Sequence, residues 1–123
     1  MIAASSFSSQ LRLTPIESAD EESLQSIGSD PAVFKFIPEI PTPFDAGTWI
    51  RSVLDNGENY IRHAIRLAST NEVIGYVQIS RRLDMHIQLG YWLGSKFWGK
   101  RFGRQAASMA LGPVFKVKKG KWT

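Results

Sequence analysis

The chain is most informative between Gly90 and Ala107, where it reads GYWLGSKFWGKRFGRQAA. The aromatic and aliphatic residues from Tyr91 to Leu93 predict a strand, the glycines after them predict a turn, and the alanines from Ala106 predict a helix. The first amides of a helix have no partners within it, and they attract anions. A strand, a glycine-rich turn and a helix in this order therefore predict a phosphate-binding pocket.

The turn supplies both space and charge for such an anion. Gly99 and Gly103 let a ligand approach the backbone, and Lys100, Arg101 and Arg104 add positive charge, which suits a pyrophosphate. The alternative is a tight strand-to-helix turn with solvated cations. The turn is not a Walker loop, because no Gly-Lys-Ser/Thr occurs in it. A Rossmann site is not expected either, because the preceding strands form predicted hairpins and not a βαβ unit.

The first half of the chain predicts one strand followed by helices. Leu11 and Leu13 alternate with polar residues, as in a half-buried strand. Ser18 and Glu21 have capping-box spacing at the start of a helix that ends at Gly28. A second short helix is expected from Asp30, with a proline-rich loop after it. A third begins within residues 42–45, and residues 56–57 close it.

The second half predicts an antiparallel meander and a last helix. The expected strands are residues 60–67, 73–79 and 85–93, and the turns between them are residues 69–72 and 81–84. The helix that starts after Gly103 is expected to break at Gly112 and Pro113. The alternation in residues 114–119 is compatible with one short strand.

Composition limits the functional classes. The length of 123 residues suits one domain, and 43% apolar and 21% charged residues are ordinary for a soluble globular protein. The absence of cysteine excludes disulfides, thiolate catalysis and cysteine-ligated metal. No run approaches the roughly 18–20 apolar residues of a membrane span. Residues 1–8 are expected to be a flexible arm without a secretory signal, so a cytoplasmic location and no membrane partner are the expectations.

The net charge of +4 comes from the end of the chain. Four of the 15 basic residues are Lys116, Lys118, Lys119 and Lys121, and removing these four leaves 11 basic against 11 acidic residues. A nucleic-acid-binding domain carries its basic residues on a folded face. Residues 113–123 are therefore expected to be a solvated basic tail, and nucleic acid is not an expected partner.

At these motifs the chain resembles the GNAT acetyltransferases, most closely their ribosomal-protein N-acetyltransferase branch. The resemblance rests on Leu89-Gly90-Tyr91-Trp92-Leu93, Phe97-Trp98-Gly99-Lys100, Phe102-Gly103 and Ala106-Ala107. Upstream, it extends to Leu11-Arg12-Leu13-Thr14-Pro15, Ser29-Asp30-Pro31, Ile65-Arg66-Leu67 and Asn71-Glu72-Val73-Ile74-Gly75. It covers roughly residues 9–112. The resemblance implies a GNAT-like α+β fold (acyl-CoA N-acyltransferase fold), with an N-terminal strand and helices followed by a three-stranded antiparallel meander. The family's later strands are missing from the chain.

The resemblance implies acetyl-CoA as co-substrate and no metal. The strand backbone at Tyr91, Trp92 and Leu93 would pair with pantetheine. The pyrophosphate would be held by the loop residues Trp98, Gly99, Lys100, Arg101, Phe102, Gly103 and Arg104. The implied reaction transfers acetyl to a primary amine, either a protein or peptide N-terminus or a small-molecule amine. No His with Asp or Glu has metal-ligand spacing.

The chain departs from the family pattern at several positions. Arg101 stands where the family has glycine, and an arginine there is strained if the position needs a positive φ. Gln88 and Gln105 stand where many relatives have glutamate, and an amide cannot act as a base. His86 is a candidate proton acceptor, with a surface or hairpin histidine as the alternative. Glu39 is a further candidate for meeting the substrate amine.

Two alternatives follow from the short chain. One is a truncated, non-catalytic GNAT-like domain that binds CoA weakly or serves as an interaction module. The other concerns assembly: the strand at residues 85–93 would expose an apolar edge, and open edges invite pairing with another chain. A homodimer through this strand, a swapped element or aggregation is therefore expected.

Overall fold

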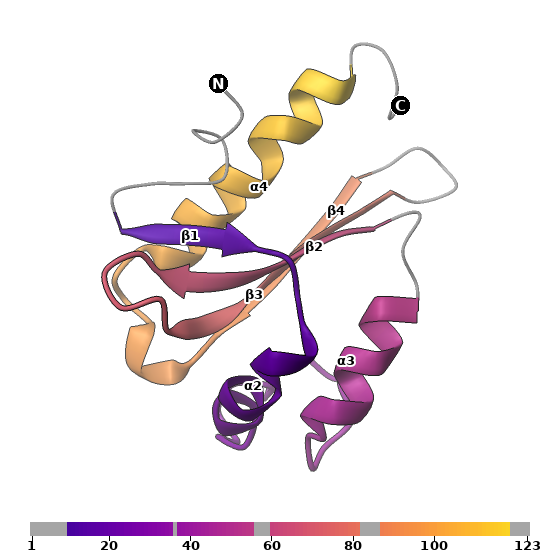
Figure 1. The fold of residues 1–123 in the computed structure, drawn as a ribbon, viewed down its shortest axis with the longest axis vertical. Coiled ribbons are helices and arrows are strands. Elements are labelled where there is room, and N and C mark those ends of the chain that lie inside the picture. Colours follow the sequence, from indigo (N-terminus) through magenta and orange to yellow (C-terminus); the bar gives the residue numbers. More distant parts are fainter. Residues whose placement is uncertain (1–9, 36, 56–59, 82–86, 119–123) are drawn as a thin grey trace.

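The computed structural model describes residues 10–35, 37–55, 60–81 and 87–118. These residues form a four-stranded antiparallel sheet in the order β1-β2-β3-β4, with helices on both faces (Figure 1). In chain order, the elements are β1 (Leu11–Thr14), the 3₁₀ helix η1 (Ser18–Asp20), α2 (Glu21–Gly28), α3 (Ala46–Asp55), β2 (Tyr60–Leu67), β3 (Val73–Arg81), β4 (Ile87–Leu93), the 3₁₀ helix η2 (Ser95–Phe97) and α4 (Phe102–Lys118). The α+β fold and the expected meander are confirmed, and β1 extends the meander by pairing with β2.

Alternation along the strands divides the interior into two cores. On the face that α4 covers, the first core contains Leu11, Ile65, Val77 and Leu93. On the face that α2 and α3 cover, the second contains Ala64, Tyr76 and Trp92 together with residues of the loop between the two helices. Both faces of the sheet are therefore covered.

Five aromatic side chains fasten that loop to the sheet. Phe34 and Phe44 come from the loop, Trp49 from α3, Tyr76 from β3 and Trp92 from β4. Their ring centroids are 4.7 to 6.1 Å apart, mostly in edge-on or tilted arrangements, which are the favoured geometries. The cluster holds the segment after α2 beside β4.

A β-bulge changes the alternation of β3. Ile65 pairs with Gly75 whereas Arg66 pairs with Val73, so Ile74 is an extra residue on β3. As a result Ile74 and Val77 both face the core beneath α4, although they are three residues apart. The position directly after the bulge, Gly75, requires glycine, because a Cβ there would lie 2.3 Å from the carbonyl oxygen of Trp92.

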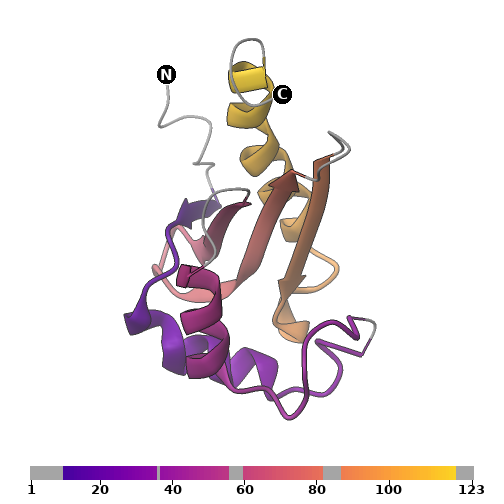
Figure 2. The same ribbon diagram turned by 90° about the vertical axis from the view of Figure 1, so that its right-hand side faces the viewer.

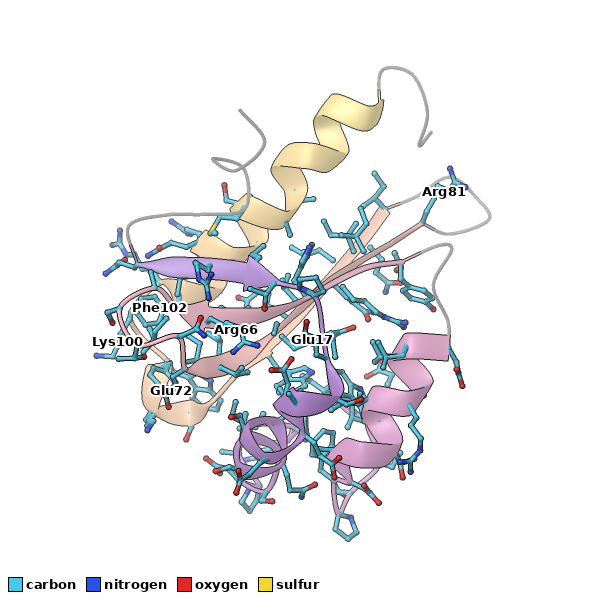
Figure 3. The ribbon with its side chains drawn as sticks, in the orientation of Figure 1. Glu17, Arg66, Glu72, Arg81, Lys100 and Phe102 are labelled. Carbon is cyan, nitrogen blue, oxygen red and sulfur yellow. The ribbon has the colours of Figure 1, made fainter. Side chains whose placement is uncertain are left out.

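A buried ion pair joins the first turn of the chain to the sheet. Arg66 contacts the Asp20 carboxylate at 2.6 Å and donates to Thr14 Oγ1 at 2.9 Å, and the Glu17 amide donates to the other Asp20 oxygen at 2.9 Å. Figure 3 shows Arg66 reaching from β2 toward the segment that contains Glu17. The expected capping pair, Ser18 with Glu21, is therefore wrong. The chain first makes the 3₁₀ helix η1, whose capping box instead pairs Glu17 with Asp20.

Two further expectations for helices are wrong. The segment after Asp30 forms turns and no second helix, with isolated bonds from the Val33 amide to the Asp30 carbonyl and from the Ile37 amide to the Phe34 carbonyl. Val33 and Phe34 are nevertheless buried, as expected. The last helix continues past Gly112 and Pro113 to Lys118, so residues 114–118 are helical and the strand expected there is wrong. A proline within a helix removes one hydrogen bond, and 17 residues of helix can tolerate that loss.

Of the other expected elements of secondary structure, some are present and some fall outside the described residues. The turn between β2 and β3 is present, with Asn71 in the left-handed region at φ 66°. The expected arm at residues 1–8, most of the turn at residues 81–84, and residues 119–123 lie outside. Within the described part of the chain, no helix is long and apolar enough to cross a membrane.

Candidate ligand site at the end of β4

A pocket of about 500 Å³ lies where β4 ends and α4 begins. Nine of the ten residues that the sequence predicts for ligand binding line it, namely Tyr91, Trp92, Leu93, Trp98, Gly99, Arg101, Phe102, Gly103 and Arg104. Lys100 is exposed and does not line the pocket; Figure 3 shows it beside Phe102. The strand, turn and helix thus bring the predicted residues to one place.

The edge of β4 offers unpaired backbone groups to this pocket. The Gly94 amide donates to the Ile74 carbonyl at 2.9 Å, which makes these opposite residues a hydrogen-bonded pair. Hydrogen-bonded and non-hydrogen-bonded pairs alternate along an antiparallel ladder. Trp92 and Gly90 therefore direct their backbone groups toward β3, whereas Tyr91 and Leu93 direct theirs toward the open edge. These outward groups can pair with an extended ligand.

Trp98 occupies one of the outward groups. Its indole Nε1 donates to the Leu93 carbonyl oxygen at 3.0 Å, although 49% of the side chain remains exposed. This bond occupies the outward-facing carbonyl of Leu93, the last residue of β4. It leaves the Leu93 amide and the Tyr91 amide and carbonyl as the outward backbone groups at this end of the strand.

The turn into α4 depends on three special backbone positions. Gly99 has a φ of 80° and Arg101 has a φ of 65°, both in the left-handed region. The strain expected for an arginine at this position is therefore present. Gly103 lets the helix approach β4, since a Cβ there would lie 2.4 Å from Cε1 of the Tyr91 ring.

Positive charge at the pocket has no acidic counterpart. Lys100, Arg101 and Arg104 are exposed at the start of α4, whose first turn has no acidic residue. Within the described ranges, no hydrogen bond or ion pair involves the side chains of these three residues. No carboxylate lines the pocket. Since the start of a helix already carries positive partial charge, this arrangement favours an anionic ligand.

The opposite wall of the pocket comes from the loop between α2 and α3, which the sequence reasoning had not assigned to the site. Val33 and Ile37 line the pocket from this loop. In Figure 2 the loop runs below the end of β4. Ser95 donates to the Asp30 carboxylate at 2.5 Å, and this bond, with one from the Ala32 amide, holds the pKa of Asp30 below its usual range. The signal in the sequence that could have predicted this wall was the set of apolar residues among the prolines of the loop.

A second pocket of about 700 Å³ lies farther back along β4. It shares Ile37, Tyr91 and Trp92 with the first pocket, and its remaining lining residues are Glu39, Ile40, Trp49, Tyr76, Gln78, Gln88, Leu89 and Gly90. Burial raises the pKa of Tyr76 to about 12, and its hydroxyl donates to Gln78 Oε1 at 2.7 Å. Tyr76 is therefore neutral at ordinary pH.

The other candidate residues lie in different parts of the molecule or outside the described residues. Glu39 lines the second pocket, as its candidacy requires, whereas His86 lies outside the described residues. His63 lies within β2, where burial lowers its pKa. Gln105 donates to Gln10 Oε1 at 2.7 Å, on the surface. Among the described residues, no three His, Cys, Asp or Glu side chains form a group that could hold a metal ion.

Comparison with known proteins assigns the chain to a family. Residues 10–121 match the family model described as an acetyltransferase (GNAT) domain. Because the match covers most of the 123 residues, the chain belongs to the GNAT acetyltransferase family. No curated protein matches the chain.

Solved structures share the fold. The chain is 23% identical to a GNAT-family acetyltransferase from Bacillus anthracis, with a TM-score of 0.75 over 89% of this chain and 65% of that one. A domain from Methanocaldococcus jannaschii is 24% identical, with a TM-score of 0.69 over 94% and 74% of the two chains. The PaiA N-acetyltransferase from Thermoplasma acidophilum, solved with coenzyme A, is 15% identical, with a TM-score of 0.54 over 89% and 74%. The chain thus spans less than two thirds of the Bacillus anthracis protein.

Proposed function

We propose that the chain is an acetyl-CoA-dependent N-acetyltransferase of the ribosomal-protein type, acting on a primary amine. One observation carries the proposal: the outward backbone groups of β4 lead directly to unpaired cations at the start of α4. A ligand that fits both must be an extended chain with amide groups at one end and phosphates at the other. Coenzyme A has this form.

The residues of the first pocket suit such a ligand. The amide and carbonyl of Tyr91 and the amide of Leu93 would pair with the pantetheine amides, as a strand edge pairs with an extended chain. The amides of the turn from Gly99 to Arg104 would hold the pyrophosphate. The thioester end would then lie near Tyr91 and Trp92, which line both pockets.

The second pocket is the proposed place of the acceptor. A neutral amine there would attack the thioester carbonyl, so that a carbon–nitrogen bond forms, the carbon–sulfur bond breaks with CoA leaving as its thiolate, and the attacking nitrogen loses a proton. Tyr76 remains protonated at neutral pH and cannot accept that proton, and an amide such as Gln88 cannot accept it either. Glu39 is the carboxylate in the lining, and we propose it as the proton acceptor, directly or through water, with His86 as the alternative. The apolar and aromatic lining suits a peptide N-terminus or a small apolar amine.

Calorimetric titration with CoA tests whether the folded protein binds the proposed co-substrate. Ligand at 100 times Kd stabilises a folded protein by about 2.7 kcal/mol, so the melting temperature is expected to rise by several degrees. A peptide library with free N-termini then reports acetyl transfer by mass spectrometry, with N-terminally blocked peptides as the control. If the folded protein binds no CoA, the proposal is wrong. If it binds CoA but acetylates no amine, the non-catalytic alternative is favoured.

We also propose that two copies of the chain pair through β4. The strand lies at the edge of the sheet, and its side chains Leu89 and Tyr91 are 38% and 44% exposed. Their outward backbone groups are the ones that a strand from a second copy would need. The same groups serve the ligand in the proposal above, so self-pairing and ligand binding exclude each other.

A further inference from the structure

Arg101 stands in a conformation that its side chain does not favour. Its φ of 65° lies in the left-handed region, where a residue with a Cβ is less stable by roughly 1–2 kcal/mol. Two residues earlier, the chain has Gly99 at a φ of 80°. Glycine would remove the strain at Arg101 too, so the arginine is not explained by the backbone.

The electrostatic position of Arg101 is also unfavourable in the absence of a ligand. Cations destabilise the start of a helix, and Lys100 and Arg104 already place two charges there. The described residues include no carboxylate bonded to the Arg101 guanidinium. Conformation and charge therefore both act against the stability of the unliganded fold.

Arg101 nevertheless lines the 500 Å³ pocket, together with Arg104. Backbone strain that no structural contact offsets is typical of functional sites. A guanidinium can bind two phosphate oxygens at once, which an ammonium or a backbone amide cannot.

We propose that Arg101 is a specificity-determining residue of this site, retained because its guanidinium binds the ligand's phosphate groups. The inference rests on the proposed function, since it concerns the same pocket. It adds that the Arg101 side chain makes part of the phosphate contact that backbone amides alone would otherwise make. The affinity for the ligand then depends on its phosphate groups.

Two variants separate charge from conformation. Arg101→Gly removes both the charge and the strain, and Arg101→Asn removes the charge with a residue that tolerates the left-handed region. Lys96→Gln is the matched control, because it removes an exposed cation that does not line the pocket. Without ligand, both variants at position 101 are expected to melt at or above the wild-type temperature, by up to about 4 °C.

The decisive measurement is calorimetric affinity for CoA, dephospho-CoA and pantetheine. We expect about tenfold weaker binding of CoA and dephospho-CoA by both variants at position 101. We also expect unchanged binding of pantetheine, which lacks phosphate, and wild-type affinities for Lys96→Gln. A loss for CoA but not dephospho-CoA would place the contact on the 3′-phosphate and still support the inference. Unchanged CoA affinity in Arg101→Gly, or an equal loss for pantetheine, overturns it. A wild-type protein that binds no CoA overturns the proposed function and the inference together.

Discussion

At the scale of single residues, the contact between Gly103 and Tyr91 controls the shape of the pocket. A Cβ at position 103 would lie 2.4 Å from the Tyr91 ring, whereas a Cβ at Gly90 would meet no atom closer than 4.0 Å. Both glycines have ordinary negative φ, so their tolerance of alanine depends on space alone. These two positions therefore make a matched pair.

Gly103→Ala is expected to lower the free energy of unfolding by about 1–3 kcal/mol, because the ring and the helix must move apart. Gly90→Ala is expected to change it by less than about 0.5 kcal/mol. Urea unfolding measures both. Equal effects of the two substitutions would show that helix α4 is not held against the Tyr91 ring.

His63 makes stability depend on pH. Burial lowers its pKa in the folded protein, so the unfolded chain binds the proton more readily. Its contribution is complete above the unfolded pKa of about 6.5 and is lost as the pH falls through the lower folded pKa. His63→Leu is therefore expected to lose less stability than the wild type between pH 7.5 and pH 5.5 in urea unfolding. A wild-type slope in His63→Leu contradicts the prediction.

At the scale of elements, Arg66 joins β1, β2 and η1 through one guanidinium. It contacts Asp20 at 2.6 Å and Thr14 at 2.9 Å, and the two charged side chains are only 14% and 4% exposed. Removing one partner of a buried pair leaves the other charge without compensation. Removing one partner is therefore expected to lower the free energy of unfolding by more than the intact ion pair contributes to it.

Arg66→Met is expected to cost about 3 kcal/mol in the free energy of unfolding, measured with urea. Adding Asp20→Asn to Arg66→Met should restore much of that loss, since the buried charge is then gone. The exposed Arg51→Ala serves as the control and should cost less than about 0.5 kcal/mol. A double variant as unstable as Arg66→Met would rule out the uncompensated charge as the cause.

The elements also show how far the sequence determines the fold and the site. Short runs of β-branched, aromatic and aliphatic residues between turn signals predict β2, β3 and β4. They do not predict the bulge at Ile74, which depends on pairing with a distant strand. Local signals also misplaced the cap at Asp20, because the carboxylate's partner Arg66 lies 46 residues away. In the site, the glycines and cations were predictable, but the bond from Trp98 to the Leu93 carbonyl required the folded turn.

At the scale of the whole molecule, the proposed dimer and the proposed ligand site share the open edge of β4. If two copies pair through β4 and CoA uses the same outward groups, each excludes the other. The fraction of dimer is therefore expected to fall as CoA is added. Sedimentation velocity at fixed protein concentration and increasing CoA measures this. A Tyr91→Pro variant, which changes an outward-facing amide, should remain monomeric throughout. Dimer content independent of CoA would place the interface elsewhere.

The indole of Trp98 also gives the protein its own optical reporter. Trp49 and Trp92 lie in the aromatic cluster, whereas Trp98 is half exposed on the wall of the first pocket. Its emission should therefore be that of a water-exposed indole, shifting to shorter wavelength when a ligand covers the ring. The chain also contains Trp122, which lies outside the described residues, so the Trp98 signal is the difference between the wild type and a Trp98→Phe variant. That variant should lose the shift and also free the Leu93 carbonyl. The hydrogen bond that shapes the edge of β4 thus places a fluorophore where occupancy of the pocket can be followed without any label.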